Sequence, residues 1–140
     1  MIQKGATLYF PVKVPGAMLA MGDLHAAMSD GEVGVTDIEI AGEVTIKVDL
    51  IKNKKLSDPM VETENAFYTI ASGANVDAAV KKASNNMFRF LKKHLELSNN
   101  ELNMLMSIIC DLQISQVVDP QKTARMRVDK EALKEYDLNY

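Results

Sequence analysis

An alternating segment in the first half of the chain places the strongest constraint on what it can fold into. In residues 43–50, Val, Ile, Val and Leu alternate with Glu, Thr, Lys and Asp. This period of two puts apolar side chains on one face and polar side chains on the other, which is typical of a half-buried antiparallel strand. Residues 33–40 alternate in a similar way, and the Ala-Gly pair at 41–42 predicts a hairpin between the two segments.

Two further segments in the same half of the chain also predict strands. Residues 6–12 are short, apolar and partly β-branched or aromatic, and prolines at positions 11 and 15 end the segment. The second segment lies within residues 61–72. The first half of the chain is therefore expected to be rich in antiparallel β-structure.

The second half of the chain has the period of helices. Asn75 is a suitable N-cap, and apolar residues recur every three or four positions from there to about residue 95. Ser98 followed by Glu101 is a capping box, which predicts the start of a second helix, whose apolar stripe runs from Leu102 to Cys110 or Leu112.

The C-terminal segments complete the predicted fold. Residues 113–118 and 126–128 predict short strands, and residues 129–136 predict a short closing helix. We therefore expect an α+β fold in a single domain, residues 1–140. Its antiparallel β-rich first half is followed by two consecutive helices and short returning strands.

The composition excludes several classes of protein. The 140 residues are 47% hydrophobic and 25% charged, which is typical of a globular protein. A net charge of −3 favours neither nucleic acid nor an anionic membrane as a partner. No apolar segment approaches the ~20 residues that span a bilayer, and the N-terminus lacks the apolar core of a signal peptide. With one cysteine the chain has no intrachain disulfide, and we expect a soluble, cytoplasmic protein.

One segment of eleven residues, 22–32, contains three carboxylates and a histidine. In an extended strand Asp23 and His25 would project from the same face. The following Asp-Gly pair predicts a tight turn, which could bring Glu32 back toward them. An imidazole and two carboxylates are a plausible ligand set for a divalent cation. Because turns are rich in Asp and Gly, an ordinary solvated turn is the alternative interpretation of this spacing.

Other residues with catalytic chemistry are weaker candidates. Cys110 lies in an apolar segment with no histidine near it in the sequence, which favours a buried structural thiol over a nucleophile. Ser29 lies close to His25, but no nucleophile-elbow pattern surrounds it. His94, near a predicted helix C-terminus, is more typical of a surface residue than of a ligand.

Three segments together resemble the acetamidase/formamidase family. They are Phe-Pro-Val at 10–12, Pro-Gly-Ala-Met-Leu-Ala-Met-Gly-Asp-Leu-His-Ala-Ala-Met at 15–28, and Asp-Gly-Glu-Val at 30–33. The similarity continues through Glu39 and resumes at Ala-Ser-Gly, 71–73. The resemblance implies a metal-dependent hydrolase that cleaves short aliphatic amides, such as formamide and acetamide, to a carboxylate and ammonia.

The resemblance also implies roles for individual residues. Asp23, His25 and Glu32 match the motif as metal-binding or catalytic positions, and the implied cofactor is a divalent metal, zinc with calcium as the alternative. Glu32 would be either a third ligand or the base that takes a proton from water. Asp30 is a second-rank candidate, because the aspartate of an Asp-Gly turn often bonds its own backbone. Asp37 stands where a small residue is more common in the family.

The resemblance covers only the C-terminal portion of the family's sequences. Three explanations account for this partial coverage: a split gene whose other half is a separate subunit, a truncated relic, or a fragment. A fold without its N-terminal portion would expose apolar surface and strand edges. We therefore expect a homo-oligomer or a separate N-terminal-half subunit as partner, besides a small amide substrate. The alternative function is a non-catalytic oligomerising or partner-binding remnant of that fold.

Overall fold

The computed structural model describes residues 2–136 of the chain. Its elements in chain order are β1 (Thr7–Tyr9), β2 (His25–Ala27), β3 (Ile38–Glu39), β4 (Met60–Glu62), β5 (Ala66–Gly73), α1 (Val76–Lys92), α2 (Asn99–Ile109), β6 (Cys110–Gln116), β7 (Lys122–Asp129) and the 3₁₀ helix η1 (Glu131–Leu133). Five strands form one antiparallel sheet in the order β1-β4-β5-β7-β6, and β2 pairs with β3 apart from it. The predicted α+β class is confirmed.

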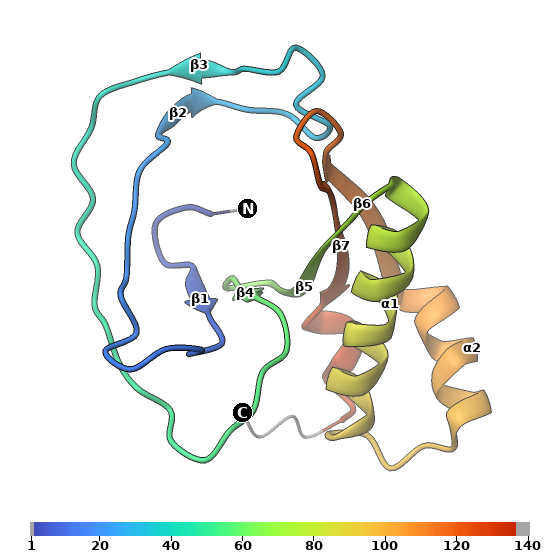
Figure 1. Ribbon diagram of the computed structural model, residues 1–140. Coiled ribbons are helices and arrows are strands. Elements are labelled where there is room, and N and C mark those ends of the chain that lie inside the picture. The colour runs from blue at the N-terminus through green and yellow to red at the C-terminus, as the bar shows by residue number, and fades with distance from the viewer. Residues whose placement is uncertain (1, 137–140) are drawn as a thin grey trace.

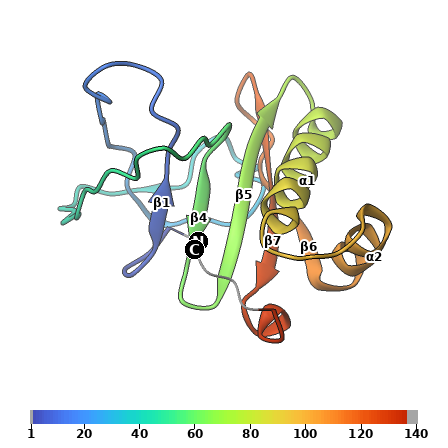
Figure 2. The ribbon, with the colours of Figure 1, turned by 90° about the horizontal axis from the view of Figure 1, so that it is seen from below.

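Helix α1 covers one face of the sheet at β5 and β7, and α2 lies beside it (Figure 2). The core between these layers has a small-residue end and a large-residue end. Ala79 and Ala83 of α1 meet alanines of the sheet at the first end, where the buried Thr69 hydroxyl donates to the Ala83 carbonyl over 2.9 Å. The buried residues of the second end include Met60, Phe67, Met87, Phe90, Leu91, Leu95, Leu102 and Val128.

Both helices begin where the sequence predicts, because their start signals are local. The Asn75 side chain accepts a hydrogen bond from the Ala78 N–H at the start of α1. At the start of α2, Ser98 and Glu101 form the predicted capping box, in which each side chain bonds the other's backbone N–H. Such caps satisfy N–H groups that have no partner within the helix.

The hairpin predicted in residues 33–50 is wrong. In its first segment, residues 33–40, only Ile38–Glu39 forms a strand, and residues 43–50 belong to no helix or strand. The apolar side chains of that segment are 47 to 71% exposed, namely Val44, Ile46, Val48 and Leu50. A strand needs a partner for its backbone groups and a layer to cover its apolar face. Within residues 2–136 this segment has neither.

The C-terminal elements differ from the prediction in their bounds. The second helix ends at Ile109, because β6 already begins at Cys110. The closing helix predicted for residues 129–136 is only a short 3₁₀ turn, η1. Asp129 instead continues β7, where it pairs with Ala66 of β5. A long antiparallel ladder therefore replaces the first turn of the predicted helix.

Between β1 and β4, residues 10–59 leave the sheet and return to it as a wide loop that carries β2 and β3 (Figure 1). We call residues 10–59 the arm. We call the turn around Gly31 the tip of the arm, and it is attached to the C-terminal end of β6. The Gly31 N–H donates to the Ser115 carbonyl, and the Val117 N–H donates to the Gly31 carbonyl, both over 3.1 Å. Beside this bridge, Arg125 Nη2 lies 2.6 Å from Asp30 Oδ1.

None of the helices in the described part of the chain has the length and apolar character needed to cross a membrane.

Candidate metal centre

The pairing of β2 with β3 positions a histidine opposite a glutamate. His25 and Glu39 are directly opposed in this antiparallel pair, and opposed residues project from the same face. His25 Nε2 lies 3.0 Å from Glu39 Oε1. The hydroxyl of Thr36 donates to the same Glu39 oxygen over 3.3 Å. The glutamate is thus held beside the ring by two neighbours.

Asp23 adds a second carboxylate on the same side of the ring. Its Oδ1 lies 3.3 Å from His25 Nε2. The predicted proximity of Asp23 and His25 is therefore found, although β2 begins only at His25 and Asp23 has a φ of +62°. A left-handed turn, rather than a continuous strand, brings the aspartate to the histidine. This conformation is tolerated better by Asp than by most residues other than Gly.

Asp23, His25 and Glu39 each offer one ligand atom, and these three atoms lie within 4.8 Å of one another. One imidazole nitrogen and two carboxylate oxygens are ligands that Zn²⁺ accepts, and a three-residue set leaves a position open for water or substrate. The His25 side chain is only 11% exposed, whereas Asp23 is 81% and Glu39 58% exposed. The group therefore opens to solvent on the side of the carboxylates, where a cation could enter.

The charges around His25 fit a cation. Partial burial acts to lower the pKa of His25, but the negative charges of Glu39, Asp23 and Asp37 outweigh this effect and raise the pKa above its ordinary value. The surrounding carboxylates thus stabilise positive charge at the ring. The same carboxylates would stabilise a divalent ion bound at Nε2 in place of the proton.

The structure separates the other two sequence candidates from this group. Glu32 is partly buried in the turn at the arm's tip, with a φ of +46°, and it is not among the three residues whose ligand atoms converge. Asp30 pairs with Arg125, which also bonds the side chains of Gln113 and Ser115. Asp30 therefore joins the arm to the sheet.

Glu39 is not among the ligands predicted from the sequence, although the family resemblance runs through it. The signal is its position opposite His25. That position is known only once β2 is paired with β3. The hairpin predicted from the sequence instead paired the segment that contains Glu39 with residues 43–50.

Cys110 and His94 lie outside this group. Burial, reinforced by the charge of Asp111, raises the pKa of the Cys110 thiol to about 12, so the thiol stays protonated and unreactive at neutral pH. The structural role predicted for this cysteine is in line with that environment. The His94 ring packs against the Phe90 ring with centroids 5.2 Å apart, and burial together with Lys54 and Lys93 lowers its pKa.

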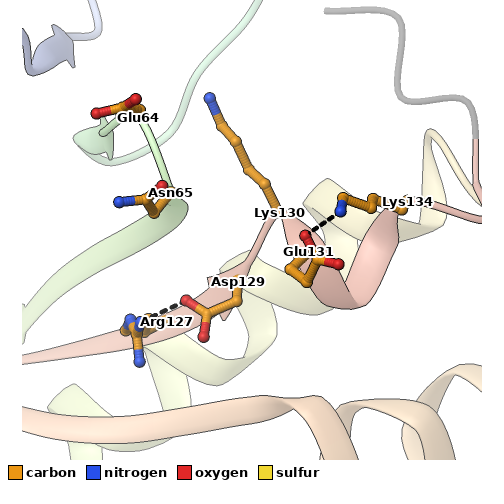
Figure 3. Close-up of a pocket in the computed structure, with 7 residues that line it drawn as sticks. All are labelled: Glu64, Asn65, Arg127, Asp129, Lys130, Glu131 and Lys134. Atoms are coloured by element: carbon orange, nitrogen blue, oxygen red, sulfur yellow. Dashed lines mark ion pairs between the residues drawn. The ribbon is translucent and has the colours of Figure 1, made fainter.

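A second charged cluster lies at the end of β7, around a pocket of about 440 Å³ (Figure 3). Its side chains pair with one another: Arg127 with Asp129, and Glu131 with Lys134. Lys130 is 2.6 Å from Glu62 on β4. The first two pairs are local, within β7 and within the η1 turn, and the Lys130–Glu62 pair joins the residue after β7 to β4. We therefore assign this cluster a structural role.

Comparison with known proteins gives the chain a family context. A sequence model described as the Acetamidase/Formamidase family matches residues 1–132. The formamidase of Methylophilus methylotrophus is 32% identical over 159 aligned positions, which cover 98% of this chain and 39% of the relative.

Two crystal structures share the fold. A predicted acetamidase/formamidase from the thermophile Thermoanaerobacter tengcongensis is 48% identical with a TM-score of 0.92, over 97% of this chain and 45% of the other. An acetamidase from Bacillus halodurans is 45% identical with a TM-score of 0.89, over 96% and 45%. The chain thus spans less than half the length of these relatives.

Proposed function

Because the chain belongs to the acetamidase/formamidase family, we propose that it takes part in the hydrolysis of short aliphatic amides, such as formamide and acetamide, to a carboxylate and ammonia. The names of its relatives, formamidase and acetamidase, support this class of substrate. The observation that carries the proposal is the convergence of Asp23, His25 and Glu39 on one point of the arm.

The same three residues are proposed to hold a divalent metal ion. Zinc suits a set with an imidazole nitrogen better than calcium does, since calcium prefers oxygen ligands throughout. When bound, such an ion supplies Lewis-acid chemistry: it lowers the pKa of a bound water and polarises the amide carbonyl. His25 would bind through Nε2, and the charges of Asp23 and Glu39 would offset that of the ion.

Glu32 is proposed to be the base that takes the water proton and returns it to the leaving nitrogen. Of the two roles that the family resemblance implies for Glu32, Glu39 takes the place of the third ligand, and the base is the role that remains. To act as this base, Glu32 has to approach the centre from the turn at the arm's tip. A positioned carboxylate base typically contributes 10²–10⁴-fold to rate. A Glu32→Gln variant is therefore expected to lose about that factor in kcat while it keeps its affinity for the metal.

The direct test follows ammonia release from formamide and acetamide with added Zn²⁺ or Ca²⁺. We expect the wild-type chain to release ammonia, either alone or after addition of the N-terminal portion of a homologous amidase, and His25→Ala to abolish release. Asp49→Ala removes an exposed carboxylate of the arm whose Oδ1 accepts a hydrogen bond from the adjacent Leu50 N–H, and serves as the matched control. Absence of release under both conditions contradicts the catalytic proposal.

A second candidate function is association, favoured by the exposed apolar side chains of the arm. Met18, Val33 and Val35 are 70 to 79% exposed, and the unpaired segment 43–50 adds an alternating apolar face. Large exposed apolar areas of this kind mark interaction surfaces. We propose that a second copy of the chain, or a separate chain equivalent to the remaining part of the relatives, covers the arm.

This second proposal predicts a particle heavier than one chain. Light scattering at micromolar concentration should give the mass of a dimer or larger, or of a complex with the added N-terminal portion. Hydrogen exchange should then show protected amides in residues 43–50, because an added strand would occupy their backbone groups. A monomer whose amides in this segment exchange freely, with or without the added portion, rules the proposal out.

A further inference from the structure

The second ring nitrogen of His25 faces a buried carboxylate oxygen of Asp37. His25 Nδ1 lies 4.0 Å from Asp37 Oδ2, on the side of the ring opposite to Asp23 and Glu39. The Asp37 side chain is 16% exposed. Its Oδ2 is fully buried and accepts no hydrogen bond from any described residue.

A buried carboxylate oxygen without a donor is costly, and most such atoms in folded proteins have a partner. The ring nitrogen that Oδ2 faces is His25 Nδ1. A hydrogen bond between these two atoms requires their separation to shorten from 4.0 Å to about 2.8 Å.

The backbone of the turn before β3 fixes Asp37 relative to the centre. The Glu39 N–H donates to the Asp37 carbonyl over 3.1 Å, and Thr36 bonds both the Asp37 carbonyl and the Glu39 carboxylate. One short turn thus places Glu39 beside Nε2 and Asp37 beside Nδ1. The ring lies between the two carboxylates.

We propose that Asp37 is a positioning residue for His25. Its Oδ2 accepts the proton of Nδ1, so that this nitrogen keeps its hydrogen and Nε2 presents its lone pair toward Asp23 and Glu39. A histidine that binds a metal through one nitrogen commonly donates the other N–H to a carboxylate, which fixes the tautomer and orients the ring. The inference rests on the proposed function, since it assigns Nε2 to the metal.

The first test is the affinity of the full chain for Zn²⁺, measured by calorimetry. Removal of a carboxylate behind a metal-binding histidine typically weakens binding about 10–100-fold. Asp37→Ala is expected to show this loss, Asp37→Asn a smaller loss because its amide oxygen still accepts, and the control Asp49→Ala none. Equal melting temperatures for the variants exclude loss of folding as the cause.

The second test observes the ring N–H groups of His25 by NMR and needs no metal. In ¹⁵N-labelled, metal-free protein at mildly acidic pH, where the imidazole is charged, both ring N–H groups can be observed; His25→Gln identifies them, since the chain has only two histidines. Asp37→Ala should shift the Nδ1–H signal and speed its exchange with water, and Glu39→Gln should affect only Nε2–H.

The two readouts separate the failure of this inference from the failure of the proposed function. An Nδ1–H signal that is the same in wild type and Asp37→Ala overturns the inference, whether or not zinc binds. A changed Nδ1–H signal with an unchanged zinc affinity also overturns it, because the contact would then not act on the metal. A wild-type chain that binds no zinc overturns the proposed metal site, and the inference with it.

Discussion

Gly73 shows how a single residue sets the distance between layers. It ends β5 beside the first turn of α1, and a Cβ at this position would lie 2.8 Å from the Ala79 nitrogen and 2.9 Å from the Ala78 Cβ. Real Cβ atoms do not approach backbone so closely, so the helix would have to move. Glycine therefore permits the close packing of α1 on the sheet at its small-residue end.

Gly73→Ala is accordingly expected to destabilise the chain by about 1–3 kcal/mol, the usual cost of forcing extra volume into a packed site. Urea unfolding followed by circular dichroism measures this directly. Gly22→Ala is the matched control, because a Cβ there meets nothing within 4 Å and the backbone angle is ordinary. If the two variants prove equally stable, the close approach at Gly73 does not constrain the packing.

At the candidate site, sequence spacing selected two of the three converging residues. Asp23 and His25 were close enough in the chain for a local argument, and their side chains do meet at 3.3 Å. Glu39 is fourteen positions from His25 and joins it only through strand pairing. Asp30 was a weaker candidate, and its partner Arg125 lies on β7, ninety-five positions away.

At the scale of elements, the helices were predictable and much of the β-structure was not. The caps of α1 and α2 depend on residues three positions apart, so the sequence alone determines them. A strand depends on its partner as well as on its own period. Residues 43–50 have the strand period but no partner within the described chain, and the alternation is therefore present without the strand.

β2 and β3 illustrate the opposite case. β2 has no long alternating pattern, and β3 occupies only two residues of the alternating segment 33–40. The two strands nevertheless pair, and the contact of His25 with Glu39 links them. Two- and three-residue strands lie below what periodicity can detect. The site therefore sits on the least predictable elements of the chain.

For the whole molecule, the packed sheet and helices form one part and the arm forms the other. The arm carries Asp23, His25 and Glu39 and is tied to the sheet at its tip by Asp30 and Gly31. The chain spans less than half of its solved relatives, and the association proposed above would cover the exposed apolar side chains of the arm.

A calorimetric titration of the chain with Zn²⁺ is the sharpest test of the proposed metal centre. We predict one ion per chain for wild type, a loss of about 100-fold or more in affinity for His25→Ala, and unchanged binding for Asp49→Ala. A wild-type chain that takes up no zinc, or a His25→Ala variant that binds it equally well, would contradict the assignment of Asp23, His25 and Glu39 as a metal centre.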